Sequence, residues 1–458
     1  MMSTAQRLVL ARLCRKLRTK LSGKAERSLR GTVPPNSLVF RTTVARPGPL
    51  TFGRSVTVAC PNSRIAWFVR QRTTFGARIL SRYSSIMDPA DIRALFPGLG
   101  DTVYLNTATM GVGCAAARDA LSEAIEQWTR GRFDWTEAER AGDAARRMFA
   151  TMVGAGPDEI AIVPAASTAA GLVAANLPRA HPGENVIVAA HEFSSNFFPW
   201  VQLKNRGYHV RTIAPPDGAL SEECFSEAAD GGTRLIAVSA VQSSDGYRVD
   251  LAAISRIAAR SGAWLFVDAS QAAGALPLDV VRDGVDFLVA ISYKFLSGPR
   301  GIGYLFVRRA LLDRLQPLTP GWKAARKPME SFYGPSMELS STASKLDTSL
   351  VWFAAVAELA TRRMFEQVGL QAIFDRNAAL TRRLHAAVGH AFPKHRLFPE
   401  PRRSQIVSIP VADSAAAMQR LREAGVVTSL RAGRIRLSPH FYNREEEIDT
   451  AVALLASG

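Results

Sequence analysis

From Asp88 to the C-terminus, short apolar runs alternate with helical patterns, and this alternation limits the folds that the chain can adopt. For example, Asp250 is placed to cap a helix that reaches Ile257, and the apolar run 264–267 follows it. Apolar runs without polar alternation are typical of strands that are buried on both faces, as in parallel sheets. The pattern therefore predicts an α/β fold with a mainly parallel sheet and functional loops at its strand ends. The expected strands are 159–163, 185–189, 234–238, 264–267 and 285–291.

Near Asp347 the pattern changes to long helices, followed by short strands and a final helix over 445–455. This change predicts three parts: a basic, disordered N-terminal extension over 1–87, a large domain over 88–346 and a small α/β domain over 347–458. No run of about 18 uncharged apolar residues occurs, so we expect no membrane-spanning helix.

The formal net charge of +17 is concentrated in the first 86 residues. That segment holds 17 Lys and Arg against the single acid Glu26, whereas the remainder holds 40 basic and 39 acidic residues. Three interpretations are open for the segment: a disordered extension or a true start at Met87, an organelle transit peptide, and an arm that binds nucleic acid. The third has the least support, because no second apolar-periodic helix follows about residue 30. We therefore expect no nucleic-acid partner.

The four cysteines are Cys14, Cys60, Cys114 and Cys224, and they form no CxxC pair. No His lies at metal-ligand spacing, so we expect neither a disulfide framework nor a metal site. Cysteine usage of this kind suits a reducing compartment. We predict a cytoplasmic protein, with organelle targeting by the basic extension as the alternative.

Two segments carry residues that are suited to catalysis. Asp268 and Gln271 come directly after the apolar strand 264–267, and Lys294 follows the apolar run 285–291 ahead of a Gly-rich turn. Each segment alone has an ordinary structural explanation, because a strand-end Asp often caps a helix and a strand-end Lys can extend its amine into solvent. Polar groups after neighbouring strands, however, gather at the edge where ligands bind in open α/β sheets.

Taken together, the segments 266–274 and 286–303 resemble those of the class V aminotransferase family, which includes cysteine desulfurase-like, selenocysteine lyase-like and isopenicillin N epimerase-like enzymes. The resemblance covers about residues 88–458. It implies the fold-type I architecture of enzymes that depend on pyridoxal 5'-phosphate (PLP). In that architecture a large domain holds a mainly parallel seven-stranded sheet between helices, and a small α/β domain follows. The resemblance also implies a homodimer with active sites at the interface.

The same resemblance implies roles for individual residues. Lys294 is expected to form a Schiff base with PLP, because burial and a cationic neighbour lower a lysine pKa from about 10.4 and free the neutral amine. Asp268 is expected to face the pyridine nitrogen and keep it protonated, which lets the ring withdraw electrons from the substrate Cα. Gln271 is expected to hydrogen-bond the phenolic oxygen of the cofactor.

Phosphate contacts are expected from Ser167 and Thr168, which lie between a strand and an Ala-rich helix, where backbone N–H groups can hold an anion. This stretch resembles the family's Gly-Thr-Thr-Glu loop, but Ala166 and Ala169 replace its Gly and its Glu. Two of the four positions of the family loop therefore carry a matching hydroxyl residue, and the other two do not. The further cofactor-binding candidates by the same resemblance are Ser292, Tyr293 and Thr348, the last donated across the dimer.

The stretch 191–200 resembles the family's Glu-His-His-x-Asn-x-x-Pro-Trp segment, in which Phe193 takes the place of the ring that stacks on the cofactor. Phe193 has no ring nitrogen, so it cannot transfer a proton as a stacking His can. Near the C-terminus, the stretch 436–449 resembles the family's Arg-x-Ser-x-x-x-Tyr-Asn-x-x-x-Glu-x-Asp ending. Arg436 matches the arginine that binds the substrate's α-carboxylate in that family.

The PLP core serves several reactions, so the residues around it decide between them. The family's cysteine desulfurases use a nucleophilic Cys on the loop around Arg431 or shortly before the final arginine. Residues 225–458 contain no Cys, so the resemblance does not imply persulfide-forming desulfuration. We expect an aminotransferase, or a C–S or C–Se lyase, that acts on a small α-amino acid. The alternatives are an isopenicillin N epimerase-like racemase and a kynureninase-like hydrolase, which Phe193 and Tyr293 favour. A PLP-binding regulator with a DNA-contacting tail is the remote alternative.

Overall fold

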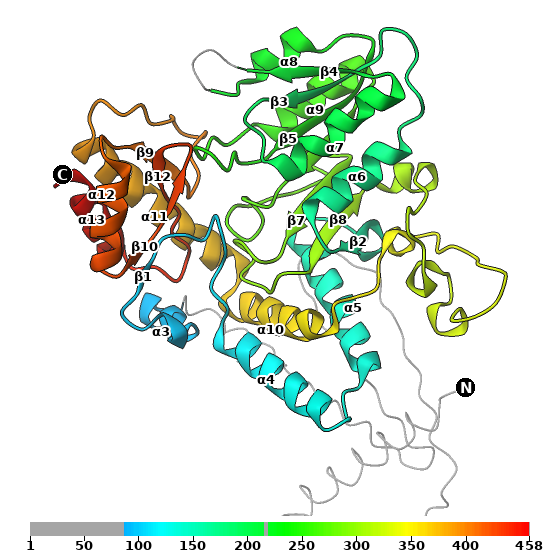
Figure 1. The fold of residues 1–458 in the computed structure, drawn as a ribbon, viewed down its shortest axis with the longest axis horizontal. Coiled ribbons are helices and arrows are strands. Elements are labelled where there is room, and N and C mark those ends of the chain that lie inside the picture. Colours follow the sequence, from blue (N-terminus) through cyan, green and yellow to red (C-terminus); the bar gives the residue numbers. More distant parts are fainter. Residues whose placement is uncertain (1–86, 215–218, 458) are drawn as a thin grey trace, which may run out of the picture. The chain divides into compact units, whose positions relative to one another are not determined.

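A computed structural model gives the structure of residues 87–214 and 219–457, so the expectation for the extension 1–87 lies outside the described residues except for Met87. The strands of the main sheet are β2 (Ile160–Val163), β3 (Asn185–Ala189), β4 (His209–Ile213), β5 (Thr233–Ser239), β6 (Trp264–Asp268), β7 (Phe287–Ile291) and β8 (Gly303–Val307). Within the described residues they form a seven-stranded sheet in the order β2-β8-β7-β6-β5-β3-β4 (Figure 1). β7, β6, β5, β3 and β4 are parallel, and β8 runs antiparallel to β2 and β7. The predicted mainly parallel α/β sheet is confirmed.

Helices cover both faces of this sheet. Successive residues of each strand point to opposite faces, so neighbouring residues of one strand are buried in two different cores. On one face, Ile162 of β2 packs in a core with Phe149 and Ile254. On the other face, Val163 packs in a second core with Val173. Asp250 caps its helix as predicted, since its Oδ1 accepts from the Ala253 amide at 3.0 Å. The helices of this part are α4 (Ala115–Thr129), α5 (Trp135–Met152), α6 (Ala166–Asn176), α7 (Phe198–Val201), α8 (Glu222–Ala228) and α9 (Leu251–Ser261).

Two long helices lead to the C-terminal elements (Figure 1). α10 (Trp352–Val368) ends at Gly369, whose φ of 88° stops the helix, and α11 (Leu370–Ala391) begins directly after it. A three-stranded antiparallel sheet in the order β11-β12-β9 then packs its apolar face on α11, α12 and α13. The small α/β unit of the predicted fold is therefore present. Its elements are β9 (Val407–Pro410), α12 (Ser414–Glu423), β10 (Val426–Val427), β11 (Ser429–Arg431), β12 (Arg434–Leu437) and α13 (Glu445–Ala456).

The first described elements, α3 (Pro89–Ala94) and β1 (Val103–Tyr104), lie with the C-terminal elements. β1 pairs in parallel with β10, and Asn106 forms a parallel bridge with Ser438. Leu105, Ile435 and other residues of the small unit share one core, as they are joined by this pairing. None of the helices in the described ranges combines the length and apolar character that crossing a bilayer requires.

Candidate active site

Several of the predicted site residues lie at one edge of the main sheet. Asp268 ends β6, Lys294 lies in the turn after β7, and Phe193 follows β3. β2 points in the same direction as β7, since both are antiparallel to β8, so α6 also begins at this edge. The carboxyl ends of parallel strands form the usual ligand-binding edge of such sheets. The structure therefore brings together residues that lie more than 100 positions apart in the sequence.

Lys294 presents a buried amine at this edge. Its side chain is 7% exposed, and its Nζ lies 5.3 Å from the centroid of the Phe193 ring. Burial lowers the pKa of Lys294 to about 8, with Arg436 and Arg431 acting in the same direction and Asp268 opposing them. A lysine with this pKa holds a useful fraction of neutral amine at physiological pH, which is the nucleophilic form.

Asp268 and Gln271 supply buried polar groups next to this lysine. The Asp268 Oδ1 accepts from the Ser270 amide at 2.8 Å, and the Gln271 Nε2 donates to the Ala108 carbonyl at 3.0 Å. In the described part of the chain, the buried Gln271 Oε1 has no hydrogen-bond partner. A buried carboxylate and an unpartnered amide oxygen beside a buried amine fit a polar ligand. The donor and acceptor set thus fits a pyridine ring that carries a phenolic oxygen and an aldehyde.

Gly111 allows a loop to cross the Lys294 turn at close range. Its amide donates to the Tyr293 carbonyl at 2.7 Å. A Cβ at position 111 would lie 2.1 Å from the Lys294 carbonyl oxygen, so only glycine fits there. The sequence analysis missed this contact, although the two closely spaced glycines Gly111 and Gly113 were a usable signal.

The Phe193 ring is half exposed, but the residue before it is firmly held. The buried Glu192 carboxylate accepts from the Ser239 amide at 2.6 Å, from Gln242 Nε2 at 2.7 Å and from Asn196 Nδ2 at 3.0 Å. Burial raises the pKa of Glu192 to about 7, while these hydrogen bonds lower it. The sequence analysis did not single out Glu192, and its spacing of four residues from Asn196 was the available signal.

Ser167 and Thr168 lie exposed on the first turn of α6. The helix begins after Ala165, which provides no side-chain cap. The first backbone N–H groups of a helix have no partner within the helix and carry partial positive charge, so they favour an anion. The first turn of α6 can therefore hold a phosphate at the same edge as Lys294.

Ser292 is placed differently from the expectation. Its hydroxyl is fully buried and donates to Glu358 of α10, which also accepts from the Tyr304 hydroxyl at 2.7 Å and pairs with Arg362 at 3.0 Å. The structure therefore directs the Ser292 side chain into a buried network that ties the lysine turn to α10. Tyr293 is half buried, and the Arg300 guanidinium lies 5.6 Å from its ring centroid.

Arg436 of β12 is buried, at 3% exposed. Its guanidinium donates to the Ser243 carbonyl at 2.7 Å and to Thr109 Oγ1 at 2.8 Å, and its Nε donates to Ser429 Oγ at 3.2 Å. Burial lowers the pKa of Arg436 to about 10, so the group stays charged at neutral pH. These partners are all neutral, which leaves the buried positive charge available for an anionic ligand.

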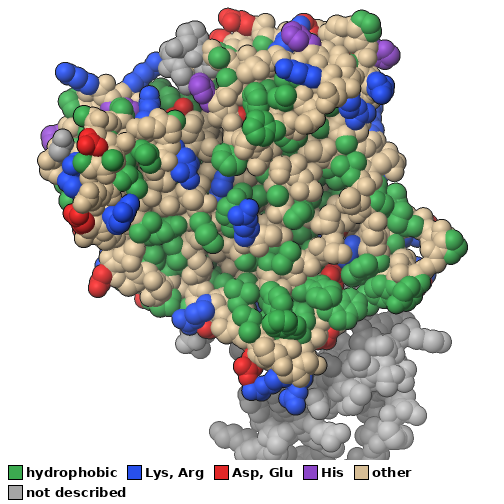
Figure 2. Space-filling view, viewed as in Figure 1, with side chains coloured by type: hydrophobic (Ala, Val, Ile, Leu, Met, Phe, Trp, Pro, Cys, Tyr) green, Lys and Arg blue, Asp and Glu red, His purple; other side chains and the backbone are tan. Residues whose placement is uncertain are grey.

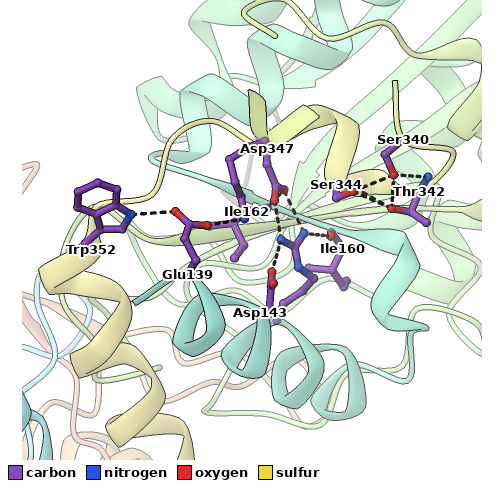
Figure 3. Close-up of polar contacts among 11 residues, drawn as sticks. Glu139, Asp143, Ile160, Ile162, Ser340, Thr342, Ser344, Asp347 and Trp352 are labelled. Atoms are coloured by element: carbon purple, nitrogen blue, oxygen red, sulfur yellow. Dashed lines mark hydrogen bonds and ion pairs between the residues drawn. The ribbon is translucent and has the colours of Figure 1, made fainter. Parts of the chain in front are cut away.

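Thr348 lies next to a buried ion pair rather than next to Lys294. Asp347 pairs with Arg146 at 2.5 Å and accepts from the Ile162 amide at 2.8 Å (Figure 3). A few residues on, Trp352 Nε1 donates to Glu139 at 2.8 Å (Figure 3). Within the described ranges, Thr348 has no hydrogen bond to the residues around Lys294. Its expected contact with a phosphate of the other subunit remains a prediction.

A fold of this architecture with a buried lysine and aspartate at the carboxyl ends of adjacent strands defines a PLP-dependent enzyme of fold-type I. The family model described as Aminotransferase class-V matches residues 117–450, and the chain belongs to this family. It is a PLP-dependent enzyme that acts on amino-acid substrates.

Known proteins resemble the chain over most of its length. It is 31% identical to the uncharacterized aminotransferase YcbU of Bacillus subtilis, over 81% of this chain and 98% of that protein. It is 30% identical to a kynureninase of Xanthomonas oryzae pv. oryzae, over 82% and 97% of the two chains. The structure matches that of an apo cysteine desulfurase from Thermococcus onnurineus with a TM-score of 0.71 and 21% identity, over 81% and 98% of the chains.

Proposed function

We propose that Lys294 is the residue that binds PLP covalently and that this site processes a small α-amino acid. The observation that carries the proposal is the buried Lys294 amine, which faces the Phe193 ring next to Asp268. When bound, PLP supplies an electron-withdrawing ring that makes the substrate Cα acidic. Asp268 then keeps the pyridine nitrogen protonated, and Phe193 covers one face of the ring and excludes water from it.

The remaining residues hold the ligands in place. The Gln271 Nε2 has a second hydrogen for the phenolic oxygen, because its first is given to Ala108. The first turn of α6 with Ser167 and Thr168 binds the phosphate. Arg436 would bind the substrate α-carboxylate, and the Lys294 amine would move the proton at the substrate Cα. Ser292 positions the lysine turn through Glu358 rather than touching the phosphate.

We propose an aminotransferase or a C–S or C–Se lyase, because residues 225–458 provide no cysteine as an acceptor of sulfur. The kynureninase relatives, together with Phe193 and Tyr293, support a hydrolase as the second candidate. Analysis of products from a broad amino-acid screen separates these reactions. Keto acid formed with amino transfer to an acceptor indicates an aminotransferase, elimination products indicate a lyase, and loss of deuterium from Cα without net product indicates an epimerase.

Borohydride trapping tests the role of Lys294 directly. We expect reduction of the PLP-loaded protein to attach the cofactor to the peptide that contains Lys294, as read by mass spectrometry. Lys294→Ala should lose this label. Lys345→Met is a matched control, because Lys345 is also buried and its pKa is also lowered by burial, but it lies outside the site. Retention of the label in Lys294→Ala would refute the assignment.

We also propose that two copies of the chain associate through an aromatic surface. Figure 2 shows hydrophobic side chains gathered over α4, α10 and the loop that follows β8. Trp128 is 61% exposed and Tyr333 is 95% exposed, which is more apolar exposure than a monomer usually shows in one place. The contacting aromatic residues of this surface are Trp128, Phe133, Trp135, Trp322, Phe332, Trp352 and Phe353.

Light scattering on the PLP-loaded protein tests this dimer. We expect a dimer in the wild type and a monomer in the double variant Trp128→Ser, Tyr333→Ser. Val281→Ser is the control, because Val281 is 74% exposed but lies outside the aromatic surface. A monomeric wild type, or a double variant that stays dimeric, would contradict this interface.

A further inference from the structure

Three arginines share one face of the β11–β12 hairpin. Arg431 pairs with Arg434 and Ser429 pairs with Arg436 in the antiparallel register, so all four side chains point to the same side. Ile435 points to the other side and is buried in the core of the small unit. The face that carries Arg436 therefore extends along the strand to Arg434, with Cα atoms about 7 Å apart for two residues of strand.

This face carries more positive charge than the described residues neutralise. Arg431 and Arg436 both donate to Thr109 Oγ1, at 3.2 and 2.8 Å, although neither gains a negative partner from it. Among the ion pairs of the described residues, none involves Arg431, Arg434 or Arg436. Asp245 interacts electrostatically with both His191 and Arg434, so one carboxylate stands against the three arginines of this face. Like charges held together on one rigid hairpin favour an anionic ligand with more than one negative group.

A cavity of about 820 Å³ opens at the Arg434 end of this face. His191, Asp245, Lys394 and Arg434 contribute its polar lining, and Phe392 and Phe398 contribute apolar walls. Its volume lies in the range of small-molecule sites.

The wall of the cavity connects it to the proposed substrate site. In the loop after β5, the Ser243 carbonyl accepts from Arg436, whereas the next residue, Ser244, lines the cavity. His191 lines the cavity and lies two residues before Phe193, which covers the lysine amine. The loops after β3 and β5 and the strand β12 therefore each contribute at least one residue to the cavity and a nearby residue to the site around Lys294 and Arg436.

We propose that this cavity is a subsite for the substrate's side chain, and that Arg434 binds an anionic group at the end of that side chain. The inference rests on the proposed function, and it names the substrate class as α-amino acids whose side chains end in a carboxylate. Because the Cα atoms of Arg434 and Arg436 lie about 7 Å apart, side chains of the length of glutamate and longer are the ones to test. Arg434 is then a specificity-determining residue, because a guanidinium binds a carboxylate through two parallel hydrogen bonds.

Absorbance titrations of the PLP-loaded protein with isosteric amino-acid pairs test the subsite. The pairs are glutamate against glutamine and 2-aminoadipate against its 6-amide, homoglutamine. We expect the wild type to bind the anionic member about 10-fold or more tightly than the neutral member, and Arg434→Gln to remove this preference without weakening the neutral members. Arg422→Gln is the control, because Arg422 is exposed on α12 and does not line the cavity.

The outcomes separate this inference from the proposed function. If neutral members bind as tightly as anionic ones, or if Arg434→Gln weakens both members equally, the subsite is refuted while amino-acid binding at Lys294 stands. If no amino acid perturbs the spectrum of the loaded protein, both proposals fail. A competition titration with glutarate, which lacks the amino group, should give the same dependence on Arg434 and provides a readout independent of turnover.

Discussion

The Gly111 amide donates to the Tyr293 carbonyl at 2.7 Å, and this hydrogen bond fixes the loop after β1 against the turn that carries Lys294. Gly111→Ala would place a Cβ 2.1 Å from the Lys294 carbonyl oxygen. We expect the turn to shift, with a loss of about 1–3 kcal/mol in the free energy of unfolding and weaker PLP binding. Gly113→Ala is the matched control, because no atom lies within 4 Å of its Cβ position. Urea denaturation and PLP titration measure both effects, and equal behaviour of the two variants would contradict the packing argument.

PLP attachment to the apoprotein should become faster as the pH rises from 7 to 9. Burial lowers the pKa of Lys294 to about 8, so the neutral amine is the minor form below that pH and the major form above it. Because the neutral amine is the reactive form, the rate should rise with an apparent pKa near 8. Stopped-flow absorbance at a series of pH values gives this profile. A rate that stays flat from pH 7 to 9 would show that deprotonation of Lys294 is not limiting.

Replacement of Arg436 should weaken the binding of any amino-acid substrate that the screen identifies. Arg436→Gln removes a buried charge that we assign to the substrate α-carboxylate, and charged hydrogen bonds of this kind contribute about 1.5–3 kcal/mol. We expect kcat/KM to fall roughly 10- to 150-fold. Arg436→Lys should retain part of the binding, because it keeps the charge but loses the planar fork. An unchanged kcat/KM in Arg436→Gln would remove Arg436 from the substrate site.

Loss of Asp347 should destabilise the part of the fold that contains the main sheet, because Asp347 contacts Arg146 of α5 and Ile162 of β2. Asp347→Ala leaves Arg146 buried without its main carboxylate partner, and breaking a buried pair in this way costs about 3–5 kcal/mol. Asp143→Ala tests the other partner of Arg146, whose side chain is 46% exposed, and should cost less than about 1 kcal/mol. Urea denaturation of both variants measures the difference. Similar losses in the free energy of unfolding of the two variants would argue against a dominant role for Asp347.

Much of the main sheet could be predicted from the sequence, because apolar runs ended by small or polar residues are a local signal. The strand 185–189 matches its prediction, and the strand that leads to Lys294 lies within the expected run. Lys294 stood out because a lysine that follows a long apolar run is unusual, whereas Asp268 gained its expected role only through the family resemblance of the two segments together. The features that depend on local pattern were therefore accessible before the structure.

Contacts between distant segments could not be predicted in this way. Thr109 meets Arg436 across 327 residues, and Ser292 meets Glu358 across 66, with no periodicity that links either pair. The Ser292 hydroxyl was a reasonable phosphate candidate by its position, but the tertiary fold buries it against α10. The cavity beside Arg434 is likewise formed by five separate stretches of chain, so no single stretch signals it.

The parallel pairing of β1 with β10 and the bridge from Asn106 to Ser438 join segments that lie more than 300 residues apart. A ribosome must therefore translate more than 300 further residues before Thr109 can meet Arg436, and the closing of that loop is a late, slow step of high contact order. The contact of Arg436 with Thr109 thus forms only after Arg436 has been made, whereas the sheet that leads to Lys294 can form earlier. A newly made chain would be competent to capture its cofactor before it could select a substrate.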